Sequence, residues 1–364
     1  MPYHPEIEFC LKLQRVIIHD PRKGRIFSQW ISFIIFDVLQ IVVPGLTLIS
    51  LIRANHVTVT GLIKIILNFT LFGHQMFRQA TLFLNQRKLV YLLETTKKFW
   101  PMEDYEGETK KLKRNSNIYL CLASFYVTAA NAKRHLRGNM SGLYIPQWMP
   151  RQAMFTIADI CQLVGSISFV SYDIMVKTFI VLVTKDMELL NRKLLKFHDH
   201  QIYGDGRNSQ LQLKECVDRY NLLREFCTVM NDVYARCMVV TFFSTTFACT
   251  VCLYMIMETL DPRILLDGIM HMATGLYFMA MFYCVPGQKL ANQVEQFSIN
   301  AYLSHWEDHP KENKNMLLVL TNIQTEFGIK AGGLIPMNMP TFMAVCRAII
   351  SYCMFFRTID GAHN

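Results

Sequence analysis

Seven long apolar stretches follow one another along this chain of 364 residues, and they limit its fold more than any other feature. An α-helix rises 1.5 Å per residue, so about 20 residues cross the roughly 30 Å of hydrocarbon in a bilayer. Most of the stretches approach or exceed that length. We therefore expect an all-α membrane protein in which seven transmembrane helices form one domain, residues 1–364, with spans at residues 27–51, 58–84, 115–133, 152–184, 231–257, 264–285 and 335–356.

Basic residues are distributed unevenly between the two sides of these spans. The N-terminal segment and the second, fourth and sixth loops hold 25 Lys and Arg residues. The odd-numbered loops and the C-terminal tail hold 7, with Lys133 at the edge of its span counted in the adjoining loop. Basic residues resist translocation. The N-terminus and the even-numbered loops should therefore be cytoplasmic, and an odd number of spans then places the C-terminus outside the cell.

The composition excludes several classes of protein. Hydrophobic residues make up 52% of the chain, which leaves little for a separate soluble domain. The net charge of +9 is explained by loops that face anionic lipid, so no nucleic-acid partner is expected. The 11 cysteines have neither disulfide nor zinc spacing, and we expect no metal and no cofactor. Asn139-Met-Ser141 matches a glycosylation signal in a loop predicted to be extracellular.

Amphipathic segments continue the spans into the predicted cytoplasm. Apolar residues recur at helical spacing from Leu213 through Tyr220 and Met230, without interruption before the fifth span. About 25 residues of such a helix would extend it by about 38 Å beyond the membrane. The apolar stripe needs partners, and the segments after the fourth and sixth spans can supply them. We expect cytoplasmic helical extensions to form an anchor bundle from approximately residues 185–230 and 286–334.

Three segments near the C-terminus resemble the insect odorant receptor family. At the end of the sixth span, Tyr283-Cys-Val-Pro-Gly287 and Leu290 are similar to that family's aromatic-Cys-x-x-Gly-x-x-Leu segment. Two further segments show the same resemblance: Ala301-Tyr302 with Trp306, and a final span that carries Thr341-Phe342, Arg347 and Ser351-Tyr352.

The resemblance implies an odorant-gated, non-selective cation channel, a heterotetramer in which a divergent odorant-binding subunit assembles with a common co-receptor. This sequence lacks the co-receptor's long insert between spans four and five, and it reads Arg357-Thr-Ile-Asp360 where that subunit has Gln-Leu-Lys. It therefore resembles the tuning subunit. The resemblance also implies the plasma membrane of a sensory neuron dendrite, and a small, neutral, volatile ligand, aromatic in character.

Two other seven-helix chemoreceptors remain alternatives. A G-protein-coupled receptor would need its N-terminus outside, against the charge distribution, and its usual motifs are replaced by Asn131-Ala-Lys-Arg-His135 and Ser351-Tyr-Cys-Met354. A gustatory receptor would end in a Thr-Tyr and Gln-Phe pattern that the chain lacks. A membrane enzyme or transporter is the third possibility, but no paired-His motif, nucleophile elbow or phosphate loop is present. We do not expect an enzyme.

A site for a volatile ligand should be lined by aromatic, Met and small residues, with few polar groups. The pocket location of the resembled family points to the outer halves of the second, third, fourth and sixth spans. Helix packing or lipid contact is the alternative role for every candidate there. The candidates for ligand binding are Phe69, Phe72, Gly73, Met76, Phe125, Tyr126, Ala129, Phe169, Tyr172, Tyr277, Phe278 and Met281.

The last span and the ionisable residues supply further expectations. Met354, Phe355, Thr358 and Ile359 lie on successive turns near the outer end of the last span, where they could line a pore or pack against other helices. Ionisable groups inside membranes are costly and therefore candidates for function. Asp173 and Lys177 are four residues apart in the fourth span, a spacing at which they could pair with each other.

Overall fold

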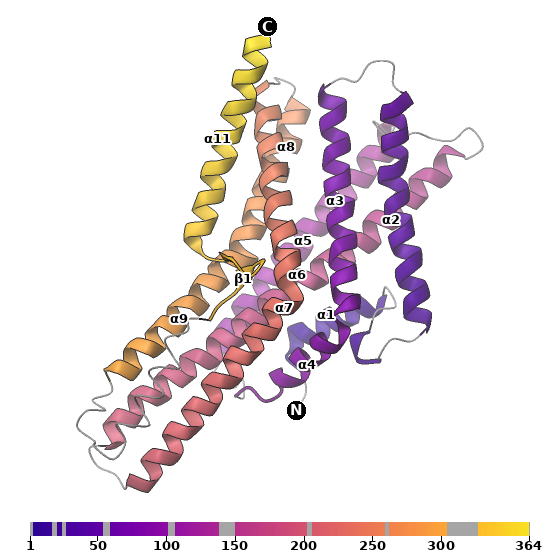
Figure 1. Cartoon of the computed structure of the whole chain (residues 1–364). Coiled ribbons are helices and arrows are strands. Elements are labelled where there is room, and N and C mark those ends of the chain that lie inside the picture. Colours follow the sequence, from indigo (N-terminus) through magenta and orange to yellow (C-terminus); the bar gives the residue numbers. More distant parts are fainter. Residues whose placement is uncertain are drawn as a thin grey trace.

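The computed structural model describes residues 3–16, 20–23, 27–53, 59–100, 106–137, 150–201, 206–258, 262–303 and 327–363. Helices account for nearly all of them (Figure 1). The only sheet within these ranges is a hairpin of two short antiparallel strands, β1 (Lys330–Ala331) and β2 (Ile335–Pro336). The predicted all-α class is therefore confirmed.

Each of the seven apolar stretches lies largely on helix. The corresponding elements are α2 (Phe27–Arg53), α3 (Val59–Leu84), α5 (Glu106–Arg137), α6 (Arg151–Gln201), α7 (Gly206–Glu258), α8 (Pro262–Phe278) with the π-helix η3 (Met279–Cys284), and α11 (Met339–His363). By length and hydropathy, four helices among the described residues could cross a membrane, at Arg151–Leu195, Lys214–Glu258, Gly268–Tyr302 and Met339–Thr358. Each of these four overlaps one of the last four predicted spans.

The last helix begins later than the sequence predicts. Residues 335–338 belong to the β-hairpin and its exit, and α11 starts at Met339. The side chain of Asn338 caps this helix, because its Oδ1 accepts a hydrogen bond from the Thr341 backbone N–H at 3.0 Å. Pro340 is tolerated there because the first turn of a helix leaves its backbone N–H groups without partners.

Gly287, in the segment that resembles the insect receptor family, lets two parts of the chain approach closely. A Cβ atom at this position would lie 2.0 Å from the carbonyl oxygen of Met337. Only a glycine can therefore lie beneath the chain that leaves β2. At the other end of the hairpin, Gly332 has a φ of 61° and donates its N–H to the Ala235 carbonyl at 2.9 Å. The hairpin is thereby joined to α7.

Three helices extend together beyond the others, whereas residues 304–326 of the predicted anchor bundle lie outside the described residues. Figure 1 shows α6, α7 and α9 (Val285–Tyr302) continuing together beyond the other helices, toward the lower left of the view. The Tyr220 ring of α7 stacks on Phe297 of α9 with 5.0 Å between ring centroids, and it meets Phe327 edge-on at 5.3 Å. Leu223 and Phe226 are fully buried in the same core. The helical period read from the sequence therefore forms the core of this bundle.

Two short helices cover the base of the molecule beside this bundle. Helix α1 (Pro5–Val16) packs against α6, and α4 (Gln86–Thr96) packs against α7. The chain after α1 is held by Asp20, which accepts hydrogen bonds from Arg15 at 2.9 Å and from Arg22 at 3.0 Å. Burial alone would raise the pKa of Asp20, but these hydrogen bonds outweigh it and lower the pKa to about 2.

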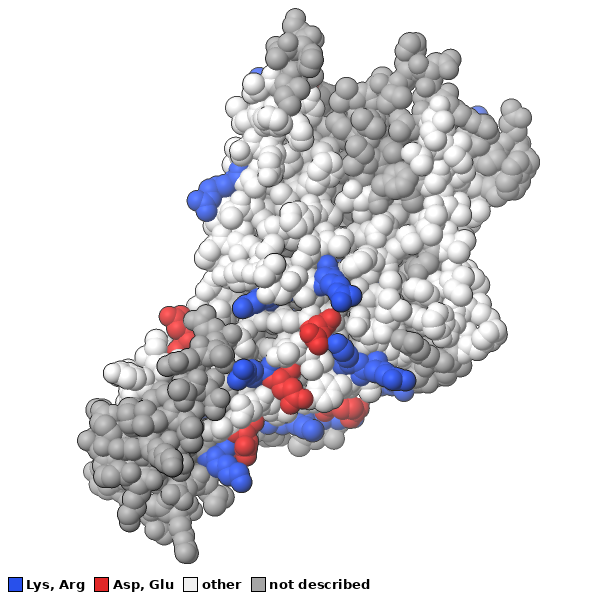
Figure 2. Space-filling model, in the orientation of Figure 1, with Lys and Arg blue, Asp and Glu red and all other residues white. Residues whose placement is uncertain are grey.

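Charged and apolar side chains occupy different ends of the surface. Among the described side chains on the face in Figure 2, most of the Lys, Arg, Asp and Glu residues gather across the lower half, and few lie in the upper half. Helix α2 exposes a run of large apolar side chains in that upper part. An apolar exterior with charges at one end is the pattern expected of a helical membrane protein. The exposed apolar residues of α2 include Ile31, Ile34, Ile35, Val38 and Ile41.

Candidate functional site

A buried ion pair lies at the centre of the transmembrane helices. Arg78 of α3 donates from Nη1 to Oδ2 of Asp173 on α6 at 2.5 Å, and both side chains are 0% exposed. Isolated buried charges are very costly, so such a pair persists only when further hydrogen bonds satisfy both groups. The surroundings of these two side chains therefore decide whether the arrangement is stable.

Two tyrosines complete the coordination of the Asp173 carboxylate. The Tyr119 hydroxyl of α5 donates to Oδ2 at 2.9 Å, and the Tyr283 hydroxyl of η3 donates to Oδ1 at 2.6 Å. Arg78, Tyr119, Asp173 and Tyr283 form what we call the Arg78 cluster. It joins α3, α5, α6 and η3, elements that are far apart in the sequence. Tyr283 reaches the carboxylate from a π-helical turn, and such turns are frequent at functional sites.

The guanidinium is also tied to α7. Its Nε donates to His74 Nε2 at 2.9 Å, and its Nη2 donates to the Thr241 hydroxyl at 3.3 Å. The Thr241 hydroxyl lies 2.8 Å from the same His74 nitrogen and donates to the Cys237 carbonyl at 2.9 Å. Arginine has five N–H donors, and here they bind partners on three helices. A single side chain therefore links α3 to both α6 and α7.

Three aromatic rings surround the same guanidinium. The distances from Arg78 Cζ to the ring centroids are 3.7 Å for Phe169, 4.9 Å for Tyr172 and 5.5 Å for Phe278. A cation within about 6 Å of a ring centroid is attracted by the negative face of the ring. All three rings belong to the ligand-binding candidates predicted from the sequence. The structure gathers them around Arg78, a charged residue that was not among the candidates predicted from the sequence.

The other ligand candidates are dispersed. Phe72 is buried in a small separate cluster with Ala158 and Cys161. Met76, Tyr277 and Met281 are half-buried, the last two against the main core, while Gly73 and Phe125 are exposed, Phe125 at 62%. The side chains of Phe69, Tyr126 and Ala129 lie outside the described part of the structure.

Helices α3 and α6 make a second, uncharged polar contact near the Arg78 cluster. Gln79 donates from Nε2 to the Ser168 hydroxyl at 2.8 Å. Gly165 of α6 leaves room for the side chain of Gln75, whose Oε1 would lie 2.1 Å from a Cβ atom at this glycine. Both glutamines are buried. The interior face of α3 is therefore polar for two turns, among helices whose exteriors are apolar.

The predicted pairing of Asp173 with Lys177 is wrong. Asp173 is engaged by the Arg78 cluster, and Lys177 Nζ instead lies 4.2 Å from the centroid of the Phe282 ring. The spacing of four residues shows only that two side chains share a helix face. Here a neighbouring helix offers the carboxylate a planar guanidinium with several donors, which satisfies it better than one ammonium group.

Some of the site residues that were not predicted have features that can be recognised in the sequence. Arg78 is a basic residue within the second apolar stretch, so its position alone made it a candidate. Tyr283 is the aromatic residue of the segment that resembles the insect receptors, but nothing in the segment indicates a carboxylate partner. Tyr119 and His74 had no distinguishing local pattern. Their role depends on helices that meet only in the fold.

The pore candidates lie on an open face of α11. Met354 and Phe355 are 50% and 59% exposed, and Thr358 donates its hydroxyl to the Met354 carbonyl at 3.0 Å. The side chain of Ile359 lies outside the described residues. Among the residues that the structure describes, no group of three or more His, Cys, Asp or Glu side chains is placed to hold a metal ion.

Comparisons with known proteins agree with this architecture. The sequence matches the 7tm Odorant receptor family over residues 87–350, and no curated protein matches it. The structure is similar to that of the insect olfactory receptor OR5 from Machilis hrabei, with a TM-score of 0.78 at 13% identity, covering 96% of this chain and 97% of that one. The same receptor in complex with eugenol gives a TM-score of 0.73 at 12% identity, covering 97% of each chain.

The residues matched by the family extend over more than half of the chain, and the shared fold extends over nearly all of it. The family match excludes the G-protein-coupled and gustatory receptor alternatives. It also confirms the expectation of a multi-pass membrane receptor that is not an enzyme. The chain belongs to the 7tm odorant receptor family.

Proposed function

We propose that this odorant receptor is the ligand-binding, tuning subunit of a heteromeric, odorant-gated, non-selective cation channel. The observation that carries the ligand-binding part is the gathering of Phe169, Tyr172 and Phe278 around Arg78 in the transmembrane interior. Eugenol, the ligand of the similar insect receptor, is a small aromatic molecule. Aromatic walls favour stacked or edge-on contact with such a ring.

The ligand of this chain is proposed to be small, neutral and volatile, with an aromatic ring. Among the described residues, Arg78 and Asp173 lie beside these rings, and they neutralise each other at 2.5 Å. An ionic ligand would therefore find the charges of Arg78 and Asp173 already paired with each other. The remaining candidates from the sequence, on α3, α5, α8 and η3, are proposed to form the rest of the pocket in the outer half of the membrane.

Alanine substitutions test this pocket. Phe72→Ala, Tyr126→Ala, Tyr172→Ala and Tyr277→Ala each remove an aromatic wall, and the lost packing of about 1–3 kcal/mol should reduce odorant sensitivity about 5-fold to 150-fold. Dose-response curves at matched surface expression measure the shift. Phe243→Ala is the control, since this ring is 60% exposed on α7. If all four variants respond like the control and rank odorants unchanged, the pocket lies elsewhere.

The pore is proposed to form from the last helix of each subunit. The exposed apolar side chains of α11 face outward from a single chain, which suits a contact with other subunits around a central axis. Met354, Phe355 and Ile359 would close the path by excluding water, and Thr358 would offer an oxygen to a hydrated cation. Arg357 and Asp360 at the outer end distinguish this chain from the co-receptor, with which it would assemble as a heterotetramer.

Co-expression tests the assembly. Because the ending of α11 departs from that of the co-receptor, the chain expressed alone should give little odorant-gated current, and robust current when the co-receptor is present. Whole-cell recording against an odorant panel measures both conditions, with the co-receptor alone as control. A full-sized response from this chain alone, in cells without any co-receptor, would show that a second subunit type is unnecessary.

The proposed orientation places the N-terminus in the cytoplasm and the C-terminus outside the cell. It is supported by the distribution of 25 against 7 basic residues, and by the opposite positions of the two ends in Figure 1. The bundle of α6, α7 and α9 is then cytoplasmic, and the receptor resides in the plasma membrane, at the dendrite of a sensory neuron. Epitope tags at both ends, stained before and after permeabilisation, distinguish this orientation from its reverse.

A further inference from the structure

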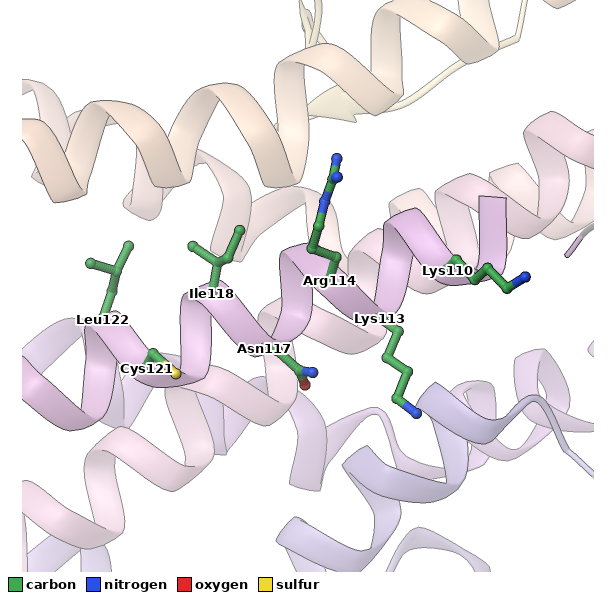
Figure 3. Close-up of a pocket in the computed structure, with 7 residues that line it drawn as sticks. All are labelled: Lys110, Lys113, Arg114, Asn117, Ile118, Cys121 and Leu122. Carbon is green, nitrogen blue, oxygen red and sulfur yellow. The ribbon is translucent and has the colours of Figure 1, made fainter. Parts of the chain in front are cut away.

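An open hollow of about 520 Å³ runs along one face of α5, away from the Arg78 cluster. Figure 3 shows the side chains that border it following one another along this single helix. These side chains are basic at one end of the hollow and apolar at the other. Lys110, Lys113 and Arg114 are at the end nearer the start of the helix, and Ile118, Cys121 and Leu122 are at the end that continues into the predicted span.

The spacing of these residues makes the face continuous. Steps of three and four residues keep side chains on one side of a helix, and such steps connect Lys110, Arg114, Ile118 and Leu122. At a rise of 1.5 Å per residue, the stretch from Lys110 to Leu122 is about 18 Å long. The face is thus amphiphilic along the helix axis. An ordinary surface helix separates its polar and apolar residues around the axis instead.

This face is directed away from the protein core. Ile118 is 41% exposed, and Lys113, Arg114 and Cys121 are also exposed. The opposite side of the helix carries Tyr119, which is buried and contacts Asp173. The hollow therefore faces what surrounds the protein: water or headgroups at the basic end and hydrocarbon at the apolar end.

We propose that this hollow binds one anionic phospholipid of the cytoplasmic leaflet. The headgroup phosphate would lie against Lys110, Lys113 and Arg114, and an acyl chain would lie along Ile118 and Leu122. The assignment rests on the orientation proposed above, in which the basic end of α5 meets the cytoplasmic headgroups, where anionic lipids are concentrated. A soluble anion or a nucleic acid would use only the basic end and leave the apolar half of the hollow uncovered.

The three cations should not contribute equally. The Glu6 carboxylate of α1 interacts electrostatically with Lys113. No such carboxylate interaction is described for Arg114, whose planar guanidinium binds phosphate oxygens through two parallel hydrogen bonds. Loss of Arg114 should therefore weaken lipid binding more than loss of Lys113.

A binding assay with purified full-length receptor tests the proposal. The probe is phosphatidylserine with a fluorescent acyl chain, titrated into receptor in neutral detergent, with equally labelled phosphatidylcholine as the reference lipid. Lys110→Gln/Lys113→Gln/Arg114→Gln should weaken phosphatidylserine binding by at least about 10-fold and leave phosphatidylcholine binding unchanged. The matched control, Arg87→Gln/Lys214→Gln/Arg236→Gln, removes the same charge from other exposed positions and should bind like wild type.

Two further arms separate a lipid from its headgroup alone. Soluble glycerophosphoserine, at the concentration at which unlabelled phosphatidylserine displaces the probe, should displace little of it because it makes no apolar contact. Ile118→Asn/Leu122→Asn should weaken lipid binding with the three cations intact. Equal binding by both triple variants, or full displacement by the soluble headgroup, would overturn the proposal. The readout needs no odorant, so its failure would leave the proposed receptor function untouched.

Discussion

The helix-extension bundle and the membrane-spanning half of this receptor both bury apolar side chains, but they differ in how deeply an ion pair between two helices is buried. In the bundle, Leu223 and Phe226 are fully buried, while Lys193 and Glu215 pair on the surface at 3.1 Å. In the membrane-spanning half, Arg78 and Asp173 are fully buried at 2.5 Å. Large apolar side chains of α2 and α11 form the exterior there.

The difference follows from the solvent around each half. Water drives apolar side chains inward, so the bundle has an apolar core and a charged exterior. Lipid tails are as apolar as leucine, so burying an apolar side chain away from them contributes little, and polar contacts between helices become comparatively more important. The Arg78 cluster therefore lies inside the helix packing, among buried apolar side chains such as Phe278 and Phe282.

Of the changes that test this comparison, breaking the buried ion pair should have the largest effect on stability. Arg78→Met leaves the Asp173 carboxylate buried without its countercharge, which should cost about 3–5 kcal/mol of stability. The double variant Arg78→Met/Asp173→Leu removes both charges and should recover at least half of that loss. Thermal unfolding in detergent, followed by fluorescence-detected size-exclusion chromatography, compares the variants with wild type.

The control for this experiment is Arg347→Met, which removes an exposed arginine from α11. It should leave the midpoint of unfolding close to that of wild type. If Arg78→Met is no more destabilising than Arg347→Met, the cluster does not hold the helices together. A double variant as unstable as the single one would show that the pair itself, and not the avoidance of an unpaired charge, is required.

Two matched lysine substitutions should show whether each half is surrounded by lipid or by water. The larger of their two stability costs should be intermediate among the predicted effects. Ile34 on α2 and Leu195 on the α6 extension are almost equally exposed, at 53% and 54%. Ile34→Lys places an ammonium group in hydrocarbon and should cost about 2.5–3.5 kcal/mol. Leu195→Lys places it in water and should change stability by about 0.5 kcal/mol or less. Surface expression and unfolding midpoints measure the two effects, and equal losses would refute the assignment of the two halves.

The smallest expected effect concerns a surface ion pair. Lys88 Nζ lies 3.0 Å from Asp232 Oδ2, with side chains 49% and 55% exposed. A double-mutant cycle of Lys88→Ala and Asp232→Ala should give a coupling of about 0.2–1 kcal/mol that decreases as salt is added. A coupling as large as that of Arg78 with Asp173 would mean that burial does not distinguish the two pairs.

Much of the fold could be predicted because its signals are local in the sequence. Apolar length predicted long helices, and the helical period from Leu213 to Met230 anticipated the extension of α7. Helix α1 was missed because its 12 residues are too short to show a clear period. The start of α11 was placed four residues early because the β-hairpin before it has the same apolar character as the helix.

The candidate site was less predictable. Phe169, Tyr172 and Phe278 were chosen for their aromatic chemistry and the location implied by a family resemblance, and the structure brings them together. Their common neighbour, Arg78, lies 95 residues from Asp173, its ion-pair partner. Helical spacing shows which residues share a face of one helix, but it contains no information on which other helix that face meets.

The sequence by itself determined the class of this protein, the order of its long apolar helices and its family, because hydropathy and motif spacing are properties of consecutive residues. Only the tertiary structure decided which groups the buried charges pair with. Asp173 could have paired with Lys177 on its own helix, yet it bonds to Arg78, Tyr119 and Tyr283 from three other elements. A buried carboxylate is stable only where several donors converge, and that convergence exists only once the helices are packed.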